Sequence, residues 1–354
     1  MTANTKSGTV RSALSGILAG ACALACLPLS AAADDFYHGK QINLIVGAGV
    51  GGGYDAYARL LVRHWPDFIP GKPSFVVQNM PAAGSLVAMN TLANTSPRDG
   101  TTIAAVQNHI GIEPLLGLTG PRQNVKYDAR AANWIGSTTK EVPVVVVWHT
   151  TSFKTFQDLI GKEVLVGSSG VATSDSVYPR VMNALVGTKF KIIEGYKSNP
   201  ELAQAIEQGE VQGRAGWFLS SLMSTKPDWV EKHEIRMLVQ VALEPYPSLP
   251  DLPLVTSFTK TQANRDQLEF ALSWLLMGRP YVAPPEVPSD RVAILRDSFM
   301  KAVQSPGFLA EAKKARLDVS PMSGEEIQAL LDKQYATPAD VVDKVRSMMT
   351  ATGK

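Results

Sequence analysis

The sequence has few cysteines and no second long apolar run. Its two cysteines, Cys22 and Cys26, both precede residue 34, so the rest of the chain has neither disulfides nor thiols. This excludes a small secreted scaffold held together by disulfides. After residue 33 no apolar run is long enough to cross a bilayer. The remaining chain therefore needs an ordinary hydrophobic core, and it is long enough for two.

The sequence also lacks an excess of charge and a metal-binding pattern. It has 34 Lys+Arg and 32 Asp+Glu, and two of the bases, Lys6 and Arg11, precede Asp34, so 32 of each sign remain after that point. A neutral chain offers no basic surface for nucleic acid. None of the five histidines stands in a metal-ligand spacing such as H-E-x-x-H. We therefore expect no nucleic acid, no metal and no cofactor.

Residues 1–33 have the pattern of a secretory signal peptide. Lys6 and Arg11 supply the positive start, the following run carries no charge, and small residues precede Asp34. We expect cleavage near Ala33 and a periplasmic location. An uncleaved or lipidated membrane anchor is the alternative, since the uncharged run approaches the length of a span.

The first half of the mature chain alternates strand and helix patterns. Apolar, β-prone segments predict strands at 42–46, 75–78 and 102–106, and helical spacing predicts helices at 54–65 and 84–94. This β-α-β-α-β order predicts a parallel sheet that binds ligands near the carboxyl ends of its strands.

A second α/β unit follows. The β-branched run at 142–148 predicts a strand buried on both faces, which we interpret as the crossing into a second lobe, and a strand at 236–241 leads back. Between them, a helix is expected to start at Asn199, with Asn as its cap. Helices starting at Ser289, at the capping box of Ser323 and Glu326, and after Thr337 are expected to pack on the first lobe.

These patterns predict a two-lobed α/β protein that forms a hinged clamp. Each lobe would contain a mainly parallel sheet flanked by helices, with two crossover strands as a hinge. The predicted division is a signal peptide at 1–33, lobe 1 at 34–141 and 246–354, and lobe 2 at 142–245.

A glycine-rich loop between the first strand and its helix is the first candidate binding site. Uncovered backbone N–H groups and the positive end of a helix attract anions such as a ligand carboxylate. The residues predicted to contact the ligand are Gly49, Gly51, Gly52, Gly53, Tyr54 and Asp55. Two alternatives stay open: the loop could only pack the helix on the sheet, and Asp55 could only satisfy N–H groups at the helix start.

The same loop fits the dinucleotide pattern G-x-G-x-x-G through Gly47, Gly49 and Gly52. That function requires an acid near the end of the second strand to hold a ribose, and the chain has Gln78 and Asn79 there. We therefore favour a carboxylate ligand over a nucleotide cofactor.

The second candidate loop lies between the strand at 164–167 and the next helix. Its hydroxyls and N–H groups at a helix start form a neutral, donor-rich site for an oxyanion, and the predicted contacts are Ser168, Ser169, Ala172, Thr173 and Ser174. Simple helix caps are the alternative. A nucleophile elbow, G-x-S-x-G, would need Gly at 171, where the chain has Val171.

Two further groups complete the candidate site. Gln107, Asn108 and His109 follow the third strand, where side chains point into a ligand crevice, and the first two are predicted to contact the ligand. Arg214, with Trp217 nearby, is predicted to clamp a carboxylate. A solvated surface arginine is the alternative, because Arg is mostly exposed.

Several separate motifs follow one another along the chain: INLIV (42–46), GGGYDAYARL (51–60), VVQNMPAAGS (76–85), PRDG (97–100), LPDLP (249–253), YVAP (281–284) and SP (305–306). In this order they resemble those of the Bug receptors, the extracytoplasmic solute-binding proteins of tripartite tricarboxylate transporters. The resemblance implies a two-lobed periplasmic binding protein of type II-like fold that closes on a small carboxylate and delivers it to membrane partners. It also implies that the glycine loop and the Ser/Thr-rich loop hold the ligand.

The chain departs from the family pattern at two places. The first loop lacks the usual aromatic, having Gly47, Ala48 and Val50 instead, which suggests a looser or larger site. A common acid of the second lobe is replaced by Gln212, so Arg214 is expected to lack an internal counter-charge and to bind the ligand.

The sequence therefore predicts a monomeric periplasmic receptor, not an enzyme, that captures a small organic acid for transporter subunits. The alternatives are a receptor that serves a sensor kinase and an exported serine hydrolase. The hydrolase would use Ser168 or Ser169 with His109 or His149, but no triad pattern supports it.

Overall fold

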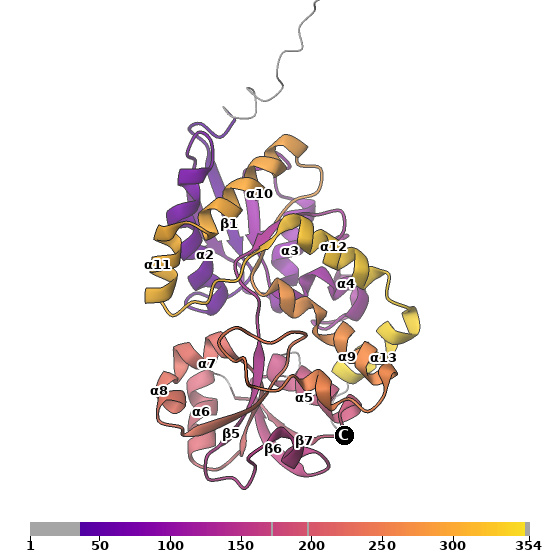
Figure 1. Ribbon diagram of the computed structural model, residues 1–354. Helices are drawn as coiled ribbons and strands as arrows, with labels where there is room; N and C mark the ends of the chain where they lie inside the picture. The colour runs from indigo at the N-terminus through magenta and orange to yellow at the C-terminus, as the bar shows by residue number, and fades with distance from the viewer. Residues whose placement is uncertain (1–35, 171–172, 197, 351–354) are drawn as a thin grey trace, which may run out of the picture.

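The computed structural model describes residues 36–170, 173–196 and 198–350, which form two lobes, one above the other in Figure 1. The signal-peptide segment and the predicted contact Ala172 lie outside these residues. Within them, no helix is long and apolar enough to cross a membrane.

The upper lobe is built on a six-stranded sheet of order β11-β4-β10-β3-β1-β2. Its strands are β1 (Gln41–Val46), β2 (Ser74–Asn79), β3 (Thr102–Ala105), β4 (Asn133–Ser137), β10 (Pro280–Ala283) and β11 (Met322–Ser323). The pairs β1–β2 and β1–β3 are parallel, as predicted, whereas β10 runs antiparallel between β3 and β4.

Helices cover both faces of this sheet. One face packs on α2 (Gly53–His64), α10 (Ser289–Val303) and α11 (Pro306–Lys314), with Leu61, Phe299 and Phe308 in the shared core. The other face packs on α3 (Leu86–Asn94) and α12 (Gly324–Tyr335). The predicted capping box of Ser323 and Glu326 is present at the start of α12. Shorter helical segments of this lobe are α4 (Glu113–Leu116), η1 (Trp65–Phe68), η2 (Ala83–Ser85), η3 (Asn108–Gly111) and η4 (Arg122–Asn124).

The lower lobe is built on a five-stranded sheet of order β7-β6-β8-β5-β9. Its strands are β5 (Pro143–Trp148), β6 (Glu163–Ser168), β7 (Lys189–Glu194), β8 (Gly213–Phe218) and β9 (Ile235–Gln240). On one face lies α5 (Ser174–Leu185); on the other lie α6 (Asn199–Glu207), α7 (Leu219–Thr225) and α8 (Pro227–Glu231). A short η5 (Phe156–Leu159) begins with a capping box at Thr155.

The valine run of β5 is buried on both faces, as predicted. Val145 and Val147 belong to the core that contains α5, and Val144 and Val146 belong to the core that contains α6 to α8. The predicted two-lobed α/β fold is confirmed. Both sheets are mixed rather than mainly parallel, because β5 pairs antiparallel with β8 and β9, and β10 returns antiparallel in the upper sheet.

The cap of α6 differs from the prediction. Ser198, not Asn199, is the N-cap, since its hydroxyl accepts a hydrogen bond from the Glu201 N–H. Asn199 is the first helical residue, and its side-chain oxygen is left to accept a hydrogen bond from Arg214.

The returning connector and the last helix join the two lobes. Gln240 is fully buried and holds the proline-rich connector through its side chain, which donates to the carbonyls of Leu249 and Leu252 and accepts from the Tyr246 N–H. The chain then forms η6 (Val255–Phe258), α9 (Gln262–Leu272) and η7 (Ser273–Met277).

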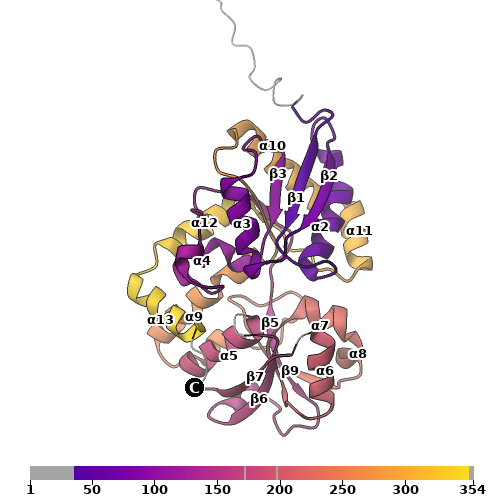
Figure 2. The same cartoon turned by 180° about the vertical axis from the view of Figure 1, so that it is seen from behind.

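The last helix, α13 (Ala339–Thr350), packs on both lobes, and not on the first lobe alone as expected from the sequence. It contacts α5 of the lower lobe, α4 of the upper lobe and α9, and Figure 2 shows α9 and α13 together beside the junction of the lobes. The physical reason is that Val342, Val345 and Met349 form an apolar face that shares a core with α5 and α9.

Candidate functional site

The glycine loop of the upper lobe is shaped by close contacts. A Cβ at Gly47 would lie 2.3 Å from the Ser85 hydroxyl oxygen, which donates to the Gly47 carbonyl. A Cβ at Gly53 would lie 2.9 Å from the Arg279 guanidinium, and Gly51 has a φ of +78°. At these positions glycine is therefore needed for packing or backbone geometry.

Asp55 holds this loop in place. Its carboxylate is 2% exposed and accepts hydrogen bonds from the Gly51 N–H (2.9 Å), Arg59 (2.9 Å) and Asn79 (3.0 Å). Burial acts to raise the pKa of Asp55, but these hydrogen bonds outweigh it and the pKa lies below its usual value. The Gly51 N–H, predicted to face the ligand, thus donates within the lobe.

The Ser/Thr-rich loop of the lower lobe is held by Asp175 at the start of α5. Asp175 is fully buried and accepts from the Ser169 N–H (3.2 Å), the Ser169 hydroxyl (3.2 Å) and the Thr173 hydroxyl. Ser168, also fully buried, lies 2.6 Å from the Ser176 hydroxyl and donates to Asp175. Three of the four predicted hydroxyls are therefore engaged by one carboxylate.

Arg214 is neither a surface arginine nor without a counter-charge. It is 5% exposed and donates to Asp175 (2.6 Å) and to Asn199 (2.8 Å), and its guanidinium lies 4.7 Å from the centre of the Trp217 ring. Burial lowers the pKa of Arg214, and the charge of Asp175 opposes that shift. The expectation that Arg214 lacks an internal counter-charge is wrong, because Asp175 supplies it in place of an acid at 212.

A cavity of about 230 Å³ lies between the two lobes, and we call it the cleft. From the upper lobe it is lined by Tyr54, at the start of α2, and by the segment after β3. From the lower lobe it is lined by the start of α5. The predicted residues that line it are Tyr54, Gln107, Asn108, Ser169, Thr173 and Ser174. The two candidate loops are thus brought to one cavity, each mainly through the first turn of its helix.

The other predicted residues do not line the cleft. Trp217 is buried in the core with Trp229, and Ser168 and Arg214 form the buried network around Asp175. The residues on either side of Tyr54 in the sequence are not among those that line the cleft: Gly49, Gly51, Gly52, Gly53 and Asp55.

The cleft also contains residues that were not predicted as contacts. They are His109, Leu118, Val177, Tyr178, Phe218 and Trp274. Val177 and Tyr178 follow Thr173 by about one helical turn, so the helix predicted there could have indicated them. Trp274 lies in η7, on a segment whose return to the cleft no local pattern reveals.

The polar groups of the upper wall are neutral. The Asn108 N–H donates to the Tyr54 hydroxyl (3.1 Å), which donates to the Gly278 carbonyl (3.2 Å). Burial lowers the pKa of His109 to about 4, so its ring is uncharged at neutral pH. Asn108 Nδ2 and His109 Nε2 are buried without a partner in the described part of the chain.

Other cavities lie away from both loops. One of about 260 Å³ lies beside the first crossing, at residues 140–142, and one of about 380 Å³ lies between α9, α12 and α13. Neither is lined by a residue of the glycine loop or the Ser/Thr-rich loop, so we assign the candidate site to the cleft. The described residues contain no group of three or more His, Cys, Asp or Glu side chains that could hold a metal ion.

Two α/β lobes with a cavity between them define the class of two-lobed solute-binding proteins. The chain matches the tripartite tricarboxylate transporter family receptor, TctC, over residues 71–346, and it belongs to this family. The resemblance stated from the motifs is confirmed. Because the family consists of receptors, the prediction of binding rather than catalysis is confirmed as well.

Solved structures show the same fold. A TctC solute-binding protein from Polaromonas has a TM-score of 0.66 at 15% identity, covering 86% of this chain and 98% of that one. MatC from Rhodopseudomonas palustris, solved with malate, has a TM-score of 0.60 at 16% identity, covering 86% and 99%. Rpa4515 from R. palustris, solved with adipate, has a TM-score of 0.62 at 19% identity, covering 87% and 97%.

Proposed function

We propose that this protein captures a small organic acid in the cleft and delivers it to a tripartite tricarboxylate-type membrane transporter. The observation that supports this most directly is that Tyr54, at the start of α2, and Ser169, Thr173 and Ser174, at the start of α5, line one cavity. Malate and adipate in two structural neighbours support a carboxylate as the ligand.

The proposed binding chemistry uses neutral donors and the positive ends of two helices. The Ser174 hydroxyl and the N–H groups at the start of α5 replace water around the carboxylate, and Tyr54 and Gln107 close the opposite side. A micromolar dissociation constant corresponds to about −8 kcal/mol. A few charge-assisted hydrogen bonds plus apolar burial reach this value.

The predicted residues then fall into two groups. Those that line the cleft contact the ligand. We propose that the others keep the two loops in shape: the glycines and Asp55 in the upper lobe, and Ser168 and Arg214 around Asp175 in the lower lobe. Trp217 supports Arg214 from the core.

We also propose the lobe limits, the export and the monomeric state expected from the sequence. Lobe 1 comprises residues 34–141 and 246–354, lobe 2 comprises 142–245, and the strands at the two crossings act as a hinge. The pattern of residues 1–33 supports export to the periplasm with cleavage near Ala33. The intact mass of the protein recovered from the periplasm tests the cleavage site, and light scattering tests the monomer.

Calorimetric titration with mono-, di- and tricarboxylates tests the binding function. Ser174→Ala is the variant of choice, because Ser174 lines the cleft and its hydroxyl is outside the Asp175 network. Loss of one hydrogen bond to a charged group, about 1.5–3 kcal/mol, should weaken binding at least about tenfold. Ser289→Ala is the matched control, since Ser289 is likewise the first residue of a helix, α10, and is exposed away from the cleft. Unchanged affinity of Ser174→Ala, or no binding of any carboxylate, would contradict the proposal.

A further inference from the structure

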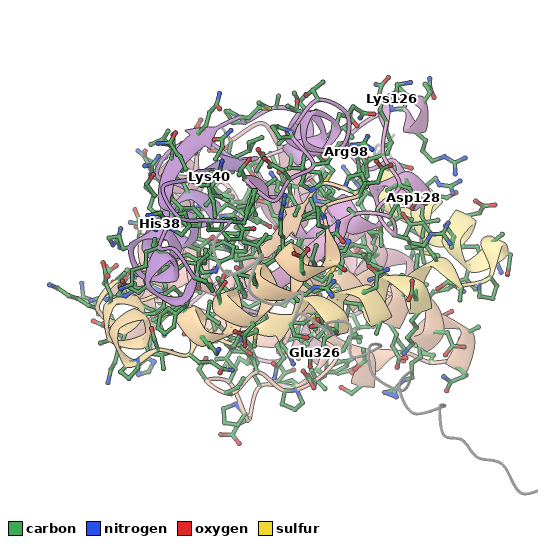
Figure 3. The ribbon with its side chains drawn as sticks, turned by 90° about the horizontal axis from the view of Figure 1, so that it is seen from above. His38, Lys40, Arg98, Lys126, Asp128 and Glu326 are labelled. Atoms are coloured by element: carbon green, nitrogen blue, oxygen red, sulfur yellow. The ribbon has the colours of Figure 1, made fainter. Side chains whose placement is uncertain are left out.

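The cleft contains no charged side chain among the described residues that line it. None of them is Lys, Arg, Asp or Glu. Two buried carboxylates are paired inside the protein, Asp175 with Arg214 and Glu141 with Arg279. A third, Glu113, accepts hydrogen bonds from the N–H groups of Leu118 and Thr119, and burial raises its pKa. Charged side chains such as Lys40, Arg98 and Lys126 lie instead on the outer end of the upper lobe, which Figure 3 shows from above. Any charge on the ligand must therefore be held by neutral groups.

Few hydroxyl hydrogens of the cleft are free to hold such a charge. The Ser169 hydroxyl donates to Asp175, and the Thr173 hydroxyl is shared between Asp175 and the Gly170 carbonyl. A hydroxyl has one hydrogen to donate. The Tyr54 hydroxyl donates to the Gly278 carbonyl. On the lower wall this leaves the Ser174 hydroxyl, with the start of α5, and the Tyr178 hydroxyl, which accepts a hydrogen bond from Trp274.

Apart from the neutral polar groups of Gln107, Asn108 and His109 on the upper wall, the rest of the lining is largely aromatic. Tyr54 contributes a ring from the upper lobe, Tyr178 and Phe218 contribute rings from the lower lobe, and Trp274 contributes one from η7. Arg279 lies 4.1 Å from the centre of the Tyr54 ring. Tyr178 and Trp274 are each only 3% exposed, so these rings are held in position by the core. Rings around a small cavity favour a flat apolar ligand, which they can stack against or contact edge to face.

The size of the cleft limits the ligand further. Its volume of about 230 Å³ lies below the ~300–1,000 Å³ of cavities that hold drug-sized molecules. The missing aromatic in the first loop does not enlarge this cavity, because residues 47–50 are not among its lining residues. A second carboxylate on a ligand of this size would meet rings and the neutral groups of Gln107, Asn108 and His109 but no cation, so its removal from water would be unfavourable.

We propose that the cleft selects a compact aromatic monocarboxylate over dicarboxylates and tricarboxylates. This inference rests on the proposed function, since it names the substrate class of the same site. The carboxylate lies at Ser174 and the start of α5, and the ring lies among Tyr54, Tyr178, Phe218 and Trp274.

Calorimetric titration with four acids tests this selectivity. Benzoate and terephthalate share a ring and differ by one carboxylate, and hexanoate and adipate form the matching aliphatic pair. We expect benzoate to bind tightest, and the second carboxylate to weaken binding at least about tenfold within each pair. Tighter binding of either diacid than of its monoacid partner would overturn this inference and leave the proposed function standing. Absence of binding by all four would overturn both.

A ring substitution separates aromatic selectivity from general apolar burial. Phe218→Leu keeps an apolar side chain but removes the ring, so we expect the ratio of benzoate to hexanoate affinity to fall at least about threefold. Phe68→Leu, in the upper lobe at η1 and outside the cleft lining, is the matched control and should leave the ratio unchanged. The ratio of the two affinities does not depend on what fraction of each variant is folded, so a partly unfolded variant does not distort the comparison. An unchanged ratio in Phe218→Leu would overturn the assignment of the ring to this wall.

Discussion

The two loops that meet at the cleft are each held by an aspartate–arginine pair, but the arginine comes from a different place in each lobe. In each, an aspartate in the first turn of a helix accepts a hydrogen bond from a loop N–H and pairs with an arginine. Asp55 pairs with Arg59, four residues later on the same helix, and the Arg59 side chain is 43% exposed. Asp175 pairs with Arg214 from β8, and that side chain is 6% exposed. Water can therefore replace Asp55 as the partner of Arg59, but it cannot readily replace Asp175 as the partner of Arg214.

The largest effect is expected from Asp175→Asn. It leaves the Arg214 guanidinium buried without a counter-charge, which costs about 3–5 kcal/mol of unfolding free energy. Urea denaturation followed by circular dichroism measures it. The double variant Asp175→Asn with Arg214→Gln should be more stable than Asp175→Asn alone, because the unpaired charge is gone. If the unfolding free energy of the double variant falls by the sum of the losses in the two single variants, the two residues are not coupled as proposed.

The upper wall of the cleft should respond to acid in a way that the lower wall does not. Burial lowers the pKa of His109 from 6.5 to about 4. Because the pKa of His109 is lower in the folded protein, the unfolded chain binds the proton more tightly. The contribution of neutral His109 to the unfolding free energy is therefore present above pH ~6.5 and is lost as the pH falls toward about 4. From ~1.4 kcal/mol per pKa unit, the unfolding free energy falls by about 3 kcal/mol between pH ~7 and pH ~4.

Chemical denaturation at a series of pH values from 7 to 4 measures this loss. His109→Gln removes the titrating ring and should flatten the dependence in that window. His149→Gln is the control, because His149 lies in the lower lobe outside the cleft lining and its ring contacts the Glu234 carbonyl at an exposed position. Equal slopes for the parent and His109→Gln would show that His109 does not titrate as described.

Asp55→Asn should lower the unfolding free energy by about 1–2 kcal/mol, which is less than for Asp175→Asn. The carboxylate and its hydrogen bonds are lost, but water can solvate the exposed Arg59 guanidinium in its place. The pKa of Asp55 lies below its usual value in the folded protein. Its contribution is therefore present above the unfolded pKa and is lost as the pH falls through the folded one. The stability difference between the parent and Asp55→Asn should accordingly narrow below pH ~4. A cost equal to that of Asp175→Asn would refute the role assigned to the exposure of Arg59.

The Asp55–Arg59 pair is local in sequence and the Asp175–Arg214 pair is not, and this contrast also explains which features could be predicted from the sequence. The capping box of Ser323 and Glu326 and the first-turn position of Asp55 are local, because their hydrogen bonds join residues three or four apart. The valine run of β5 was readable as a strand buried on both faces for a similar reason, since alternate side chains point to opposite sides. Such elements were predicted correctly from short windows of sequence.

The partners that come from distant segments were not predictable in this way. Arg214 and Asp175 are 39 residues apart, and only the packing of β8 beside α5 brings them together. Trp274 reaches the cleft through the returning connector, and α13 packs on the lower lobe through a core shared with α5. Hydrophobic periodicity shows that a helix has an apolar face but not which surface will cover it.

The smallest effect is expected within the glycine loop itself. Gly51 has a φ of +78°, a conformation that costs a residue with a Cβ about 1 kcal/mol. Gly49 has no atom within 4 Å of an added Cβ and needs no positive φ. Gly51→Ala should therefore lower the unfolding free energy by about 1 kcal/mol and Gly49→Ala by less than about 0.5 kcal/mol, measured by urea denaturation. Similar losses of unfolding free energy in both variants would mean that the loop needs positions without side chains in general. The positive φ of Gly51, whose N–H donates to Asp55, would then have no special role.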